Sequence, residues 1–297
     1  MLPIILTNGK GIESEELSQF NDESIAGLRL TERILLILAS EGFDRVQLVT
    51  DIPDLRFKRL NKKFPNFEIV QSKGLIALDK NTDLLVFQNN IVLNKKQLQS
   101  ALEAIKNNDE SIIIGEQNKS GIIFIKNYCQ SIHKKEPESI KEISANFKRF
   151  RPQDPPLKLD AAQLNTNAGR DFLFDHISKN VSGWFSKRIN SKISIPISKL
   201  LIRTSIHPNV ITFIVGLIGI SCGIFYALNM PFIGAIILQC ATILDRCDGE
   251  VARIKLRESK FGQWFDTALD QISYFSMFLG ISICLNNPKF FYFTSDH

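Results

Sequence analysis

Residues 209–270 read NVITFIVGLIGISCGIFYALNMPFIGAIILQCATILDRCDGEVARIKLRESKFGQWFDTALD, and this stretch decides the architecture of the C-terminal part of the chain. Its first portion, residues 209–244, contains no charged side chain, although charged residues make up 23% of the whole sequence. An apolar helix of ~20 residues is long enough to cross a membrane. The run therefore predicts an integral membrane protein and excludes both a purely soluble and a disordered chain.

The apolar runs predict three spanning helices. Residues 209–228 form the first, with His207-Pro208-Asn209 as its cap. The run at 230–244 spans only if its helix continues into the polar segment that follows, and the run at 271–286 only if its helix begins near Gly262. The segment joining these two helices is basic, whereas the turn near 229–231 has no charge. The positive-inside rule then predicts a multi-pass protein whose N-terminal part and basic segment are cytoplasmic.

Four aspartates stand at the predicted cytoplasmic ends of the second and third helices: Asp245, Asp248, Asp266 and Asp270. Spacings of three and four residues place each pair on one helix face, so antiparallel neighbours can present all four to one cavity. A carboxylate at membrane depth costs about 2.5–3.5 kcal/mol, and four would repel one another. Hard divalent cations, Mg²⁺ or Mn²⁺ and two ions in number, compensate such a cluster. The alternative is a set of structural salt bridges to Arg246, Arg253 or Lys255.

The same residues match the pattern D-x2-D-G-x2-A-R-x8-G-x3-D-x3-D at every fixed position, from Asp245 to Asp270. This pattern is the signature of the CDP-alcohol phosphotransferases, and the resemblance covers roughly residues 170–297. It implies a membrane transferase that displaces CMP from a CDP-alcohol with the hydroxyl of a second, small polar alcohol. Cleavage of a pyrophosphate needs charge neutralisation, which metal ions supply.

The resemblance also implies roles for individual residues. Asp245, Asp248 and Asp266 would be metal ligands, and Asp270 both a ligand and the base for the acceptor hydroxyl. The nucleotide would be held by Gly249, Ala252, Arg253, Gly262, Asn209 and Thr212. Small residues there would let the backbone approach the cytidine. Alternatively, Arg253 only neutralises Asp248, and Asn209 and Thr212 only cap a helix.

Residues 1–148 alternate between β-rich runs and helical patterns. We predict helices at 28–40 and 95–107, and strands at 3–6, 45–50, 67–70, 83–87, 111–114 and 122–125. This alternation indicates a three-layer α/β domain with a mostly parallel sheet.

The N-terminal pattern resembles a nucleotidyltransferase domain, because a first strand leads into the loop Thr7-Asn8-Gly9-Lys10-Gly11. Active members hold a triphosphate in that loop and a metal on an aspartate after the middle strand. Here an acidic run follows the loop, and the neutral Asn89 and Asn90 stand where the aspartate is expected. We therefore expect a degenerate docking or regulatory domain.

Between the two halves we predict an extended linker over residues 149–174, because it is rich in proline at 149–160. Residues 175–206 alternate apolar and basic side chains and predict an amphipathic helix in the lipid headgroup layer, broken or kinked near Pro196. The alternative is a solvated basic helix packed on the soluble domain. Residues 207–297 would form the transmembrane transferase domain.

The net charge, the cysteines and the family pattern limit which partners we expect. A net charge of +5 without interleaved aromatic and basic residues favours membrane lipids over nucleic acid. Five cysteines without paired spacing indicate reduced thiols. The fusion resembles the bifunctional inositol-phosphate cytidylyltransferase/di-inositol-phosphate synthase arrangement, which implies CDP-inositol as donor. CDP-diacylglycerol is equally compatible with the pattern.

The family usually has more spans than the three found here, so we expect a truncated sequence or a natural fragment, and a homodimer in the complete form. One alternative function is a catalytically incomplete pseudoenzyme or a half-site that binds a partner chain. Another is a divalent-ion transporter, which leaves the glycines, Ala252 and Arg253 unexplained.

Overall fold

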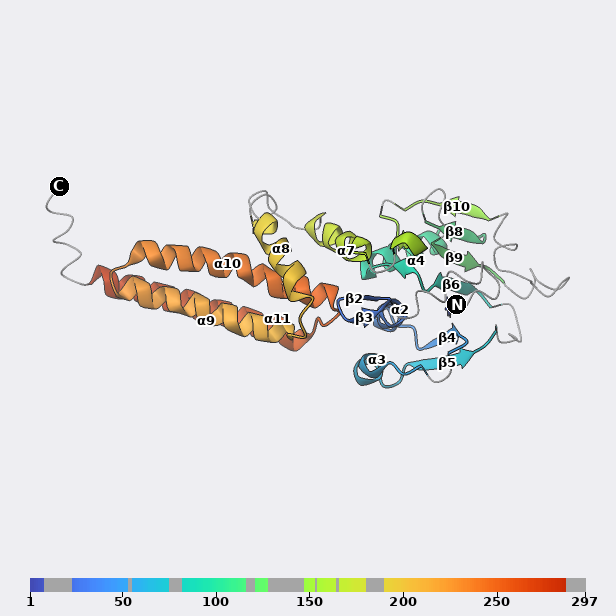
Figure 1. Cartoon of the computed structure of the whole chain (residues 1–297), viewed down its shortest axis with the longest axis horizontal. Helices are drawn as coiled ribbons and strands as arrows, with labels where there is room; N and C mark the ends of the chain where they lie inside the picture. The colour runs from blue at the N-terminus through green and yellow to red at the C-terminus, as the bar shows by residue number, and fades with distance from the viewer. Residues whose placement is uncertain are drawn as a thin grey trace. The chain divides into compact units, whose positions relative to one another are not determined.

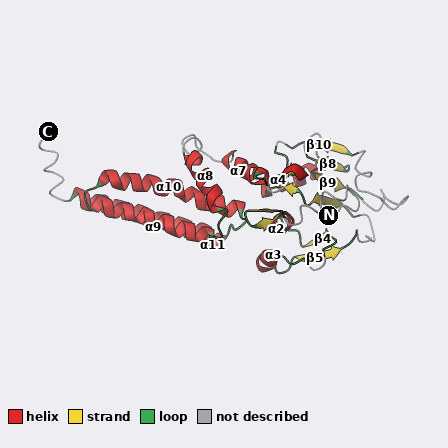
Figure 2. Cartoon of the chain, viewed as in Figure 1, coloured by secondary structure: helices red, strands yellow, loops and turns green. Residues whose placement is uncertain are grey.

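A computed structural model describes residues 1–7, 23–52, 55–74, 82–115, 121–127, 147–152, 154–163, 166–179 and 190–286. The chain divides into two compact units, Met1–Leu173 and Phe174–His297. The strands belong to the first unit and the long helices to the second, as Figures 1 and 2 show.

The first unit is built on a seven-stranded mixed sheet in the order β10-β8-β9-β6-β1-β4-β5. Its strands are β1 (Leu2–Leu6), β4 (Arg45–Val49), β5 (Glu68–Ser72), β6 (Leu84–Gln88), β8 (Ile112–Ile114), β9 (Ile122–Ile125) and β10 (Lys148–Phe150). Only β9 runs antiparallel to its neighbours β6 and β8 within this sheet as described. The predicted α/β class and mostly parallel sheet are confirmed.

Alternation of side chains explains the core of this sheet. Every second residue of the central strands, such as Ile4, Leu6, Leu84 and Val86, is buried in one hydrophobic cluster. The helices α2 (Leu30–Ser40), α3 (Lys58–Lys63) and α4 (Lys95–Lys106) accompany the sheet. Asn94 caps α4 through a reciprocal pair of hydrogen bonds with Gln97.

The structure differs from the predicted linker at 149–174. Part of β10 lies there and pairs with β8 at the sheet edge, and β11 (Leu157–Lys158) pairs with β7 (Ile91–Val92). The short helix η1 (Ala161–Gln163) follows, and α7 (Ala168–Lys179) crosses the division between the units. These residues therefore complete the α/β unit instead of separating it from the next. A two-stranded ribbon of β2 (Ser24–Ile25) and β3 (Leu28–Arg29) was also not predicted.

The second unit contains α8 (Ser191–Leu201), α9 (Pro208–Ala227), α10 (Pro231–Ile254) and α11 (Lys260–Leu285). As predicted, α10 continues through the polar segment and α11 begins ahead of its apolar run. By length and composition, α9 and α11 could each cross a membrane. Of the predicted break or kink near Pro196, the break is wrong, because α8 runs through this proline. Of the amphipathic segment predicted over 175–206, the part at 180–189 lies outside the described residues.

Small residues allow α9 and α11 to pack closely. A Cβ added at Gly280 would overlap the carbonyl group of Gly223, and one added at Gly219 would lie 2.6 Å from the Ser273 hydroxyl. The Ser276 hydroxyl donates a hydrogen bond of 2.8 Å to the carbonyl of Ile220. Such close approach with interhelical hydroxyl bonds is typical of helices in membranes.

The outward sides of these helices are apolar. Phe213 and Leu217 on α9, Phe232 on α10, and Phe275 and Phe278 on α11 are between 49% and 77% exposed. An apolar surface of this extent is costly in water and favourable in lipid.

Candidate active site

Three of the four predicted aspartates meet where α10 and α11 approach each other. Carboxylate oxygens of Asp245, Asp248 and Asp266 all lie within 4.8 Å of one another. Oxygen Oδ1 of Asp266 is buried and has no hydrogen-bond partner within the described part of the chain. A free, buried carboxylate oxygen beside two further carboxylates fits the donor set of a hard divalent cation.

Asp270 lies one helical turn further along α11. It lines a small cavity of about 60 Å³ together with Asp245 and Asp266. The remainder of that cavity is walled by residues of the three helices, some small or polar, such as Gly216 and Ser273, and others apolar, such as Leu238 and Leu269. The structure therefore places Asp270 beside the carboxylate group, facing the same space as two of its members.

A second cavity of about 140 Å³ borders the aspartates on their other side. It is lined by all six residues that the sequence predicted for the nucleotide: Asn209, Thr212, Gly249, Ala252, Arg253 and Gly262. Asp248 and Asp266 also line it. Sequence reasoning missed Arg257, Glu258, Ser259 and Gln263, which also line it. Their position between two motif residues is the only signal that could have indicated them.

The beginning of α9 is fixed directly to the carboxylate group. His207 caps the helix, with its Nδ1 accepting a 3.3 Å hydrogen bond from the backbone N–H of Asn209, and Pro208 occupies the first turn. The Thr212 hydroxyl donates to the carboxylate of Asp248 and lies 3.2 Å from the carbonyl oxygen of Pro208. Thr212 thus orients a candidate ligand, a role that the sequence did not reveal.

The two motif glycines serve different local needs. A Cβ added at Gly249 would meet only the end of the Arg253 side chain, at 3.8 Å, so the space beside this backbone is open. A Cβ at Gly262 would lie 3.1 Å from the Ser259 hydroxyl and 3.2 Å from Asn209 Oδ1. Ser259 caps α11 by accepting a 3.0 Å hydrogen bond from the Gly262 N–H. Gly249 therefore leaves room in the cavity, whereas Gly262 permits a tight helix start.

Nearby basic residues have partners other than the aspartates. Arg253 lies 3.8 Å from Glu258, and Arg246 lies 3.6 Å from Glu250. The Lys255 ammonium donates to the carbonyl groups of Thr204 and Ile206, at 2.7 and 3.2 Å. These contacts weigh against the interpretation of the aspartates as members of structural salt bridges.

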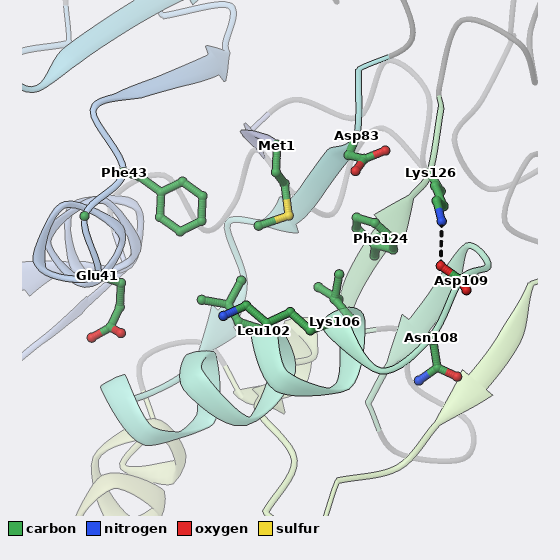
Figure 3. A pocket seen from close by; sticks show the side chains of 12 residues that line it. Met1, Glu41, Phe43, Asp83, Leu102, Lys106, Asn108, Asp109, Phe124 and Lys126 are labelled. Atoms are coloured by element: carbon green, nitrogen blue, oxygen red, sulfur yellow. Dashed lines mark hydrogen bonds and ion pairs between the residues drawn. The ribbon is translucent and has the colours of Figure 1, made fainter.

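A larger cavity, of about 420 Å³, lies in the α/β unit (Figure 3). Met1, Phe43 and Phe124 surround it, and Asp109 and Lys126 form an ion pair of 2.9 Å on its rim. Met1 precedes β1, so this cavity lies at the edge where that strand begins. Parallel α/β sheets bind ligands at the opposite edge, beyond the carboxyl ends of the strands.

At that opposite edge, Asn89 and Asn90 follow β6 and are buried. The side-chain amide of Asn90 donates a 2.9 Å hydrogen bond to the carbonyl of Leu159. The backbone N–H of Leu159 donates a second bond, also of 2.9 Å, to the backbone carbonyl of Asn90. Asn90 therefore anchors Leu159, the residue directly after β11. The loop predicted to resemble a triphosphate site, residues 8–11, lies outside the described residues.

Comparison with known proteins supports the assignment of the helical unit. Residues 205–294 match the family CDP-alcohol phosphatidyltransferase. A bifunctional IPC transferase and DIPP synthase of Archaeoglobus fulgidus is 34% identical over 133 residues, covering 45% of this chain and 26% of that protein. An archaetidylinositol phosphate synthase of Pyrococcus horikoshii is 33% identical over 99 residues, covering 32% of this chain and 53% of that protein. The chain thus spans about a quarter of the bifunctional relatives' length.

Among solved structures, an inositol-1-phosphate CTP transferase from T. maritima aligns with 61% of this chain and 97% of its own, at 11% identity and a TM-score of 0.39. The family match covers the cap of α9, both aspartate pairs and the cavity between them. Over residues 205–294 the helical unit is therefore similar to the CDP-alcohol phosphatidyltransferases.

Proposed function

We propose that this protein transfers a substituted phosphate group from a CDP-alcohol to the hydroxyl of a second alcohol and releases CMP. One observation carries the proposal: three clustered carboxylates adjoin a cavity whose walls contain all six residues expected to hold the nucleotide. The ion-transporter alternative requires the carboxylates but offers no reason for this cavity.

Asp245, Asp248 and Asp266 would hold divalent cations, with Asp270 beside them. Mg²⁺ and Mn²⁺ both suit an all-oxygen donor set, and we expect two ions. When bound, they neutralise the negative charge of the donor's pyrophosphate.

The protein's own groups have distinct tasks in this reaction. The open space beside Gly249 and the guanidinium of Arg253 receive the nucleotide. The acceptor's hydroxyl oxygen forms a bond to the phosphorus that carries the donor's alcohol, and the bond from that phosphorus to the CMP oxygen breaks. The Asp270 carboxylate takes the proton of the attacking hydroxyl, because it faces the cavity on the side away from the nucleotide.

The apolar outer faces of α9, α10 and α11 support a multi-pass membrane location. The basic residues between α10 and α11 support a cytoplasmic position for the aspartates. Two relatives are named as an archaetidylinositol phosphate synthase and a phosphatidylinositol phosphate synthase. Their names favour inositol phosphate as the acceptor here, with CDP-diacylglycerol or CDP-inositol as the donor.

The test is release of CMP by the full chain reconstituted in lipid vesicles with Mg²⁺, inositol phosphate and either donor. We expect Asp245→Asn and Asp266→Asn each to lower turnover by about a hundredfold or more, because each removes a charge that holds the metal. Asp109→Asn, an exposed aspartate of the α/β unit, is the matched control and should leave turnover unchanged.

Near-normal turnover in both site variants would refute the metal site. Binding of the donor without any CMP release in the wild-type chain would instead favour the pseudoenzyme.

A further inference from the structure

Behind the aspartates, α10 carries a fifth acidic residue that the reaction does not use. Glu250 is only 3% exposed, and both of its carboxylate oxygens accept hydrogen bonds from α8. Ser194 donates to Oε1 at 2.9 Å and Ser198 donates to Oε2 at 2.7 Å. Arg246 adds a charged contact at 3.6 Å. A buried carboxylate needs such a full set of partners, so this arrangement is specific rather than incidental.

Helix geometry places this contact opposite the metal ligands. At about 100° per residue, Glu250 projects from α10 roughly 170° away from the mean direction of Asp245 and Asp248. The helix is therefore held on one side by α8 while its other side presents the aspartates to α11. A carboxylate lies ~6 Å from the helix axis, so a turn of ~20° about that axis would displace it by ~2 Å. The distances between Mg²⁺ and its ligand atoms vary by far less than this displacement.

α8 is oriented so that two of its serines face α10. Ser194 and Ser198 are fully buried against α10, whereas Ile193 and Leu200 on the same helix are 44% and 65% exposed. The exposed side of α8 also carries Lys192 and Pro196, whereas Ile195, Ile197 and Leu201 are half-buried on either side of the serines. The two hydroxyls stand one helical turn apart and each serves a different oxygen of one carboxylate, so the contact is directional.

We propose that Glu250 is a positioning residue: together with Ser194 and Ser198 it fixes the rotation of α10 and so aims Asp245 and Asp248 at Asp266. This inference rests on the proposed metal site. α8, the helix that precedes α9, thereby also shapes that site.

The test is the affinity of the purified full chain for Mn²⁺, measured by electron paramagnetic resonance, beside its thermal unfolding. Ser194→Ala with Ser198→Ala should weaken Mn²⁺ binding about tenfold, the effect typical of lost outer-shell partners. Adding Glu250→Leu to that pair removes the unpaired buried charge and should restore the unfolding temperature without restoring the affinity. Glu250→Gln keeps a group that can bond both hydroxyls and should stay within about threefold of the wild type.

Ser276→Ala is the control, because it removes another interhelical hydroxyl bond, between α11 and α9, away from Glu250. It should leave Mn²⁺ affinity unchanged. Wild-type affinity in the double serine variant and in the triple variant that adds Glu250→Leu would overturn the positioning role. Equal weakening in Ser276→Ala would also overturn it, since any loss of packing would then suffice. A wild-type chain that binds no Mn²⁺ would overturn the proposed function itself, and this inference with it.

Discussion

Asp248 is the most enclosed of the four aspartates, with 6% of its surface exposed, and it belongs both to the carboxylate group and to the wall of the cavity that we propose for the nucleotide. Its carboxylate accepts a hydrogen bond from Thr212, so one of its oxygens is already oriented. A metal ligand held by a second residue keeps its geometry when the metal arrives. The first turn of α9 therefore contributes to the site through Asp248 and not only through the cavity wall.

Thr212→Val tests this role because valine has nearly the shape of threonine but cannot donate a hydrogen bond. We expect Mn²⁺ affinity and CMP release to fall about tenfold while the helices remain folded. Thr212→Ser should recover most of both, since it retains the hydroxyl. Equal behaviour of the valine and wild-type proteins would show that Asp248 needs no such partner.

Gly249→Ala separates the needs of the fold from those of the nucleotide. Alanine is favoured over glycine within a helix by up to ~1 kcal/mol, and the added methyl meets only the end of Arg253. We therefore expect a slightly higher free energy of unfolding together with a raised KM for the CDP-alcohol, because the methyl occupies space in the cavity. Unchanged KM in kinetic assays would place the nucleotide elsewhere.

At the scale of elements, α9 and α11 are joined by small residues rather than by large apolar ones. Gly223 and Gly280 face each other with no space for a side chain, and Ser276 bonds across to α9 nearby. In lipid, where apolar burial between helices gains little, such close backbone contact supplies the association.

Gly280→Val should destabilise this helix pair by about 3 kcal/mol, because the new side chain would overlap the backbone of Gly223. Thermal unfolding of the detergent-solubilised chain measures the effect. Gly234→Ala is the control: its new methyl would lie 3.1 Å from the Tyr226 ring and 3.2 Å from the Cys222 carbonyl oxygen, with no overlap as close as the 2.1 Å at Gly280. Equal stability of the two variants would argue against the close packing of α9 on α11.

Sequence patterns predicted those elements whose residues carry their own periodicity. The strands near Leu2–Leu6 and Ile122–Ile125 and the helix Lys95–Lys106 lie within two residues of their predicted bounds. The strand Leu157–Lys158 was missed, because it forms only through pairing with Ile91–Val92, far away in the sequence. Local proline content pointed instead to a linker.

The site shows the same division between local and distant information. The aspartates follow from spacing along two helices, and their motif could be found in the sequence alone. The contact of Ser194 and Ser198 with Glu250 joins residues more than fifty positions apart, and the serines lie in a helix that also carries apolar and basic residues. No periodicity in the sequence predicts such a pairing, so only the structure could identify it.

For the whole molecule, each unit has a packed interior of its own, and the two tryptophans of the chain, Trp184 and Trp264, both follow Leu173. Tryptophan emission therefore reports on the second unit alone. Unfolding of the α/β unit can be followed separately by the circular dichroism of its sheet. The chain thus offers a separate signal for each unit.

Asn90→Ala should destabilise the α/β unit by about 1–3 kcal/mol, because it removes the buried amide that donates to the Leu159 carbonyl and leaves that carbonyl without this partner. The second unit does not use this contact, so the temperature at which tryptophan emission changes should stay at its wild-type value, as should Mn²⁺ affinity. Asp109→Asn, on the exposed rim of the same unit, should alter neither transition by more than about 0.5 kcal/mol. If the tryptophan transition moves together with the circular dichroism in Asn90→Ala, the units unfold as one, and the state of the α/β unit then bears directly on the site between α10 and α11.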